Sequence, residues 1–64
     1  MNEERPIVFT ISDEGNGVVG VKTKDPRGEH MNGLATRNIL FSYMAMLTSE
    51  FNNNGGYAVL FEVY

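Results

Sequence analysis

The absence of cysteine from a chain of only 64 residues is the feature that most limits how this protein can fold. A domain of about 60 residues buries only roughly 60% of the surface that its unfolded chain exposes, so small domains usually need a disulfide, a metal or a partner subunit. Disulfides and thiolate metal sites are excluded here, and one histidine, His30, is too few for a histidine-based metal site in one chain. We therefore expect a single domain, residues 1–64, with no metal and no cofactor, that gains burial by oligomerising.

The composition also bears on where the protein acts. Residues 1–5 are acidic and polar, unlike the start of a secretory signal, and the longest uncharged run, residues 38–49, is shorter than the ~20 apolar residues of a membrane-spanning helix. A chain without cysteine suits a reducing compartment. These features predict a cytoplasmic protein that does not contact a membrane, and the small size is compatible with a phage or mobile-element origin.

Alternating apolar residues predict a β-hairpin over residues 6–12 and 18–24. A two-residue loop, Asn16-Gly17, would pair Ile11 with Lys22. A three-residue loop, residues 15–17, would pair Ile11 with Val21 and would put Gly17 at the left-handed position. Because side chains alternate with a period of two, the hydrophobic match favours the three-residue loop.

The remaining residues predict one helix and a last strand. The helix, of roughly 18 residues, should begin between Asn32 and Thr36, with Asn32 as the best N-cap, and should end in the Asn- and Gly-rich run 52–56. Residues 57–64 are rich in aromatic and β-branched side chains, which favours a strand. The predicted fold is α+β in the order ββαβ: a three-stranded antiparallel sheet, strand order 2-1-3, with one helix packed on one face.

The periodicity assigns a core but leaves open which sheet face meets the helix. We expect the inner sheet face to carry Ile7, Phe9, Ile11, Val19, Val21, Tyr57, Val59, Phe61 and Val63. At about 100° per residue, the facing side of the helix carries Leu40, Tyr43, Met44, Leu47 and Phe51.

Both flanks of the predicted helix are still apolar after this assignment. Ile39, Met46 and Ala35 fall on one flank, and Leu34, Phe41 and Ala45 fall on the other. A helix that is apolar most of the way round needs cover on more than one side, and contiguous apolar patches usually mark interaction sites. The alternative is that these residues are the ordinary periphery of a core. The predicted protein-interface residues are Ile39, Met46, Leu34, Phe41, Val8, Val18 and Leu60.

Residues that could carry catalysis are sparse. The run 15–20 matches G-x-G-x-x-G, but a strand pattern follows it where a phosphate site needs a helix. The adjacent acids, Glu3-Glu4 and Asp13-Glu14, would point to opposite faces of a strand. His30 follows Glu29 in a loop, and a chain this small is expected to lack a pocket of ~300 Å³. The sequence therefore predicts that the protein is not an enzyme.

Two functions follow from these features. The first is a non-enzymatic protein–protein interaction module, a small inhibitor or adaptor, that forms a homodimer or binds a larger protein. The alternative is nucleic-acid binding through the basic segment 22–37, using Lys22, Lys24, Arg27 and Arg37. The net charge of −3 argues against it, because nucleic-acid affinity comes largely from cationic side chains that displace counterions.

Overall fold

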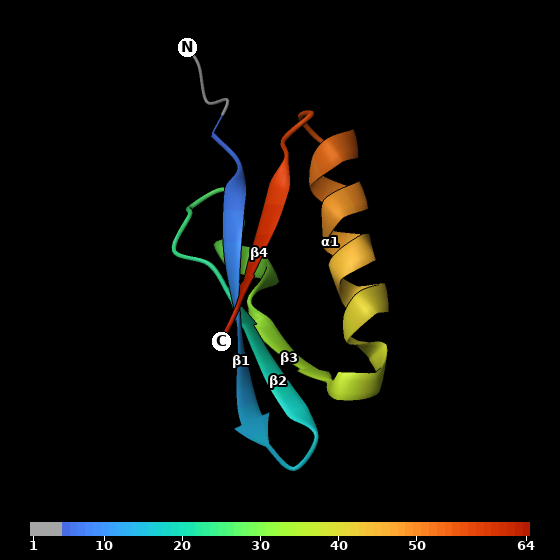
Figure 1. The fold of residues 1–64 in the computed structure, drawn as a ribbon. Helices are drawn as coiled ribbons and strands as arrows, with labels where there is room; N and C mark the ends of the chain where they lie inside the picture. The colour runs from blue at the N-terminus through green and yellow to red at the C-terminus, as the bar shows by residue number, and fades with distance from the viewer. Residues whose placement is uncertain (1–4) are drawn as a thin grey trace.

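The computed structural model describes residues 5–64, which form a four-stranded sheet with one α-helix packed on one face (Figure 1). The elements are β1 (Ile7–Gly15), β2 (Val18–Lys22), β3 (Gly33–Thr36), α1 (Leu40–Asn53) and β4 (Val59–Val63), with 3₁₀ turns η1 (Glu29–Met31) and η2 (Arg37–Ile39). The strand order is β3-β2-β1-β4. The β3–β2 and β2–β1 pairs are antiparallel, whereas β4 is parallel to β1. The α+β class and the single packed helix are confirmed.

The hairpin of β1 and β2 has the predicted core register, with Ile11 opposite Val21. Its tip differs from the favoured three-residue loop, because Gly15 pairs with Val18 and leaves only two residues in the turn. Asn16 and Gly17, with φ angles of 57° and 75°, form a two-residue turn of the kind that suits hairpins. A register shift in β1 just before this turn adds one residue, and this β-bulge restores the pairing of the apolar side chains.

Residues 33–36 form β3, where the sequence predicts the first turn of the helix. Asn32 is therefore not a helix N-cap. Its side-chain amide accepts a hydrogen bond from the N–H of Thr23 (2.8 Å) and donates one to the C=O of Thr23 (3.2 Å). A side chain thus continues the ladder of β2 by one residue. The helix begins only at Leu40. It ends at Asn53, within the run 52–56 where the sequence predicted its end.

The additional strand changes the direction of the last one. Because β3 reverses the chain once more, α1 connects β3 rather than β2 to the final strand, and β4 runs parallel to β1. The predicted neighbours of the first strand are correct, since β1 lies between β2 and β4. The prediction of a three-stranded antiparallel sheet is wrong, because it missed a strand of four residues.

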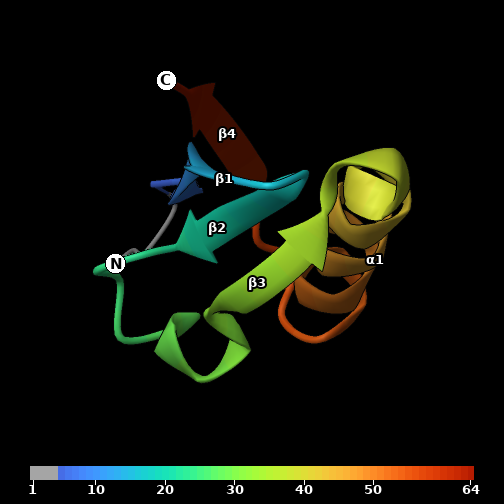
Figure 2. The ribbon, with the colours of Figure 1, turned by 90° about the horizontal axis from the view of Figure 1, so that it is seen from below.

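The helix covers the sheet face that was assigned to the core (Figure 2). The buried apolar residues are Ile7, Phe9, Ile11, Val19, Val21, Ala35, Leu47 and Phe51. The ring of Phe9 lies 6.0 Å from the rings of both Phe51 and Phe61, which joins the helix to β4. Two assignments are corrected: Ala35 enters the core from β3 rather than flanking the helix, and Val63 is 69% exposed.

Candidate functional site

The sheet face opposite α1 carries an open groove of about 1010 Å³. The strands contribute Val8, Thr10 and Lys22, and the segments beside them contribute Arg5, Lys24 and Pro26. Val8, Thr10 and Lys22 lie on the outer face because they alternate with Ile7, Phe9 and Val21 of the core. The expectation that so small a chain has no pocket above ~300 Å³ is therefore wrong. The sheet supplies a concave surface rather than an enclosed cavity.

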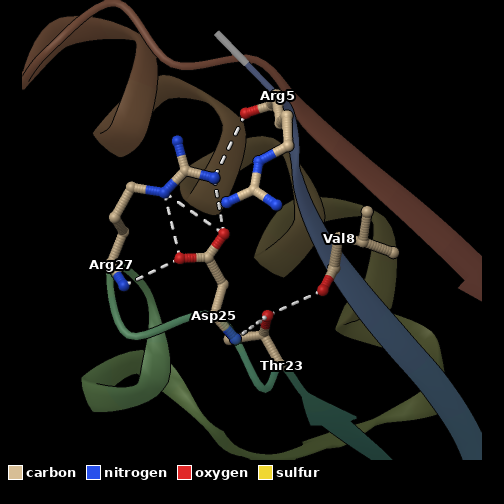
Figure 3. A network of polar contacts seen from close by, with 5 residues as sticks. All are labelled: Arg5, Val8, Thr23, Asp25 and Arg27. Carbon is tan, nitrogen blue, oxygen red and sulfur yellow. Dashed lines mark hydrogen bonds and ion pairs between the residues drawn. The ribbon is translucent and has the colours of Figure 1, made fainter. Parts of the chain in front are cut away.

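One end of the groove is built by hydrogen bonds around Thr23 (Figure 3). The Thr23 side chain is buried, and its hydroxyl donates to the C=O of Val8 (2.7 Å) and accepts from the N–H of Asp25 (3.1 Å). A buried hydroxyl with both partners present holds the chain firmly, because losing either partner would leave a desolvated polar group. The loop after β2 is thereby held against β1.

Asp25 and Arg27 form an ion pair at the same end (Figure 3). The Arg27 Nε donates to Asp25 Oδ1 (3.0 Å), Nη2 donates to Oδ2, and Nη2 also donates to the C=O of Arg5 (3.1 Å). The side-chain hydrogen bond from Arg27 lowers the pKa of Asp25 from 3.8 to about 2. The guanidinium also lies over the ring of Tyr57, 4.9 Å from its centroid. Arg27 therefore has a structural role in joining three segments.

The four basic residues that were predicted to bind nucleic acid lie at different places in the structure. Lys22 and Lys24 are exposed beside the groove. Arg27 makes the contacts just described. Arg37 lies at the hairpin end of the sheet, where its Nη2 contacts Asp13 Oδ2 at 2.6 Å. The N–H of Gly15 and the charge of Arg37 lower the pKa of Asp13. The four side chains therefore do not form one basic patch.

The predicted interface residues lie on two different surfaces. Phe41 is 85% exposed, and Ile39 and Met46 are about half-exposed, on the helix side of the molecule. The other four lie on the outer sheet face: Val8, Val18, Leu34 and Leu60. The first three alternate with buried residues along their strands, and Leu60 pairs with Val8. Leu34 was expected on the helix and instead comes from β3. The exposed apolar side chains are therefore not one contiguous strip along α1.

Most residues of the groove were not predicted as site residues, Arg5 and Asn32 among them. Arg5 comes two residues before β1, and Asn32 comes nine residues after Thr23. No local pattern indicates that either reaches the groove, because each is brought there by pairing between distant segments. The run Asp25-Pro26-Arg27-Gly28 does carry a local signal, because proline at its second position and glycine at its fourth are typical of the turn that forms the end of the groove.

The residues considered for catalysis are dispersed. His30 is exposed, and its ring makes a T-shaped contact with the ring of Phe51, with 6.1 Å between centroids. Asp13 and Glu14 lie near the hairpin tip, whereas Glu3 and Glu4 lie outside the described residues. Residues 5–64 contain no cluster of three His, Asp or Glu side chains that could hold a metal ion. The glycine-rich run is the hairpin tip followed by β2.

Comparisons with protein-family models, curated proteins and solved structures found no match for this chain. Within the part of the chain that the structure describes, no helix has the length and apolar character needed to cross a membrane.

Proposed function

We propose that this protein is a non-enzymatic protein–protein interaction module that self-associates. The observation that carries this proposal is the balance between buried and exposed apolar residues. Among residues 5–64, eight apolar side chains are buried, while seven large ones are 44% to 85% exposed. These seven are Leu34, Ile39, Phe41, Met46, Leu60, Val63 and Tyr64. A cysteine-free composition also suits a reducing compartment such as the cytoplasm.

The physical reason is that a small fold gains stability when a second surface covers such residues. Burial of apolar area contributes roughly 25 cal/mol per Å² to stability, and a domain of this size has only a small core. The exposed residues occur on both layers, which permits contact with a second copy and with a larger protein at once. A small inhibitor or adaptor works in this way, with one surface for assembly and another for its target.

Sedimentation equilibrium tests self-association directly. We expect a monomer–dimer equilibrium between about 1 µM and about 500 µM, the range in which a modest interface is detected. Apolar contact should make the dimer insensitive to salt between about 50 mM and about 500 mM, since screening acts on charges. A protein that sediments as a monomer throughout this range would overturn the proposal.

A double variant tests the helix surface. Replacing Ile39 and Met46 by alanine should weaken capture of a larger partner or self-association, because both side chains are half-exposed. Ser49→Ala, at an exposed polar position of α1, is the matched control. If neither kind of association changes in the double variant, the helix surface has no part in the interaction.

A second candidate function is nucleic-acid binding in the groove, which Lys22, Lys24 and Arg5 favour by lining it together. Fluorescence anisotropy of labelled single- and double-stranded oligonucleotides at ~50 mM salt is the test. Lys22→Gln with Lys24→Gln should weaken binding and reduce the salt slope by about 2. Arg37→Gln, at the far hairpin end, should have little effect. If no oligonucleotide binds at ~50 mM salt, this candidate is discarded.

A further inference from the structure

The last strand of the sheet has one free edge. β4 ends the strand order, so among residues 5–64 it has β1 as its sole neighbour (Figure 2). The N–H of Ile7 donates to the C=O of Ala58 (2.8 Å), and the N–H of Tyr64 donates to the C=O of Ile11 (3.0 Å). Alternate residues of a strand direct their backbone groups to the same side. Ala58, Leu60, Glu62 and Tyr64 therefore face β1, and Val59, Phe61 and Val63 direct their N–H and C=O groups outward.

This edge has few of the features by which proteins usually protect an edge strand. The sequence of β4 is Val-Leu-Phe-Glu-Val, which contains no proline and no lysine and has a high strand propensity. Its one charge, Glu62, lies opposite Thr10 on the outer face. Leu60 and Val63 are 53% and 69% exposed. An open apolar edge of this kind is a template for a further strand.

We propose that the added strand is β4 of a second copy, paired antiparallel about a two-fold axis at Phe61. This inference rests on the proposed self-association and names its surface. In this register Phe61 pairs with Phe61 of the second copy, and Val59 pairs with Val63 in both directions. Every outward N–H and C=O of the strand then has a partner. The two sheets become one sheet of eight strands, and Val63, which is 69% exposed in the monomer, gains a second apolar neighbour besides Ile11.

The two neighbouring registers give poorer strand pairing. An axis at Glu62 would set two carboxylates directly opposite each other, which destabilises a strand pair. An axis at Leu60 would pair Val63 with Tyr57, whose N–H already donates to the C=O of Phe51 (3.0 Å). With the axis at Phe61, Glu62 lies opposite Leu60 of the second copy, so no like charges meet. Of these three registers, the one centred on Phe61 alone avoids both problems.

Cysteine cross-linking of two single variants, Leu60→Cys and Glu62→Cys, tests the register. Both positions are exposed on the outer face, and the chain has no cysteine of its own. In the proposed pairing, residues 60 and 62 are a non-hydrogen-bonded pair with Cα atoms about 4.5 Å apart, which a disulfide can span. Identical positions lie about 7–8 Å apart, which it cannot. Mild oxidation of a 1:1 mixture should cross-link up to about half of the dimers, and each variant by itself should remain uncross-linked.

The other outcomes of this experiment overturn the proposal in distinct ways. Cross-linking of Leu60→Cys by itself or of Glu62→Cys by itself would establish a different register. If the wild-type chain is a dimer by sedimentation but no sample cross-links, the β4 edge is not the interface, although the proposed function stands. A wild-type monomer would overturn both.

A proline variant supplies a second test that does not use oxidation. Val63→Pro removes one outward N–H, a position at which an edge strand tolerates proline. We expect dimerisation to weaken roughly tenfold or more, because a pair of backbone hydrogen bonds is lost. Val63→Thr keeps the N–H and is the matched control. Equal dimerisation of Val63→Pro and Val63→Thr would contradict the proposed edge.

Discussion

At the scale of single residues, polar side chains hold the groove where backbone pairing stops. Asn32 pairs with both backbone groups of Thr23, and the hydroxyl of Thr23 bridges Val8 and Asp25. Asp25 then binds Arg27, whose guanidinium lies over Tyr57. These contacts join segments that are far apart in the chain. The shape of the outer face therefore depends on a few side chains as well as on the sheet.

The ion pair of Asp25 predicts a dependence of stability on pH. The folded-state pKa of Asp25, about 2, lies below its ordinary value of 3.8, so the ion pair stabilises the protein fully above pH ~4 and loses this effect as the pH falls toward about 2. Asp25→Asn should lower the free energy of unfolding by on the order of 1–2 kcal/mol at pH ~6. Urea denaturation of both proteins at several pH values measures this difference.

The difference between Asp25→Asn and wild type should shrink in acid, because wild-type Asp25 is then protonated as well. Glu29→Gln is the control, since its carboxylate is exposed. A difference for Asp25→Asn that stays constant down to pH ~2 would show that the ion pair is not its cause.

At the scale of elements, the hairpin is the part that the local sequence determines most directly. The turn needs two residues with positive φ, and Asn16 and Gly17 supply them. The β-bulge before the turn then adjusts the register so that Ile11 meets Val21. Local turn chemistry and the hydrophobic pattern therefore agree, although each alone suggested a different loop length.

Gly17→Ala tests the turn. With φ at 75°, an alanine at this position should cost about 1–2 kcal/mol of folding free energy. Gly33→Ala is a matched control in β3, because its added methyl group would meet only the hydroxyl oxygen of Tyr43 at an ordinary 3.7 Å. We expect the control to change stability by less than about 0.5 kcal/mol. Thermal or urea unfolding that ranks the two variants in the opposite order would contradict this account of the turn.

At the scale of the whole molecule, one helix divides its apolar residues between the core and the surface. Phe51 is 5% exposed and contacts Phe9, whereas Phe41 of the same helix is 85% exposed. The first stabilises the monomer. The exposed ring of Phe41 contributes almost nothing to the stability of the monomer, so its position on the surface suits contact with another molecule.

Two phenylalanine variants separate these roles. Phe51→Ala should lower the free energy of unfolding by about 3–5 kcal/mol, which is most of the stability of a small domain. Phe41→Ser should change the monomer by less than about 0.5 kcal/mol while reducing binding of a partner protein. Circular dichroism during urea titration gives the first quantity, and sedimentation with the partner gives the second. A large loss of stability in Phe41→Ser would show that this side chain stabilises the monomer.

The sequence determined the features that depend on neighbouring residues. Alternation and turn chemistry predicted the hairpin with its core register, the end of the helix at Asn53, and most of the buried face. These features were accessible because their physical causes act over a few residues: side-chain period, φ preference and capping.

Tertiary structure decided the rest. β3 has only four residues, Gly-Leu-Ala-Thr, whose local preference is weak, and it exists as a strand because β2 offers it an edge. That strand sets the direction of β4, and with it the parallel pairing and the free edge. The groove likewise joins residues on both sides of the hairpin, such as Arg5 and Asn32. Pairing between distant segments leaves no local pattern in the sequence, because its free energy comes from contacts that form only when the whole chain folds.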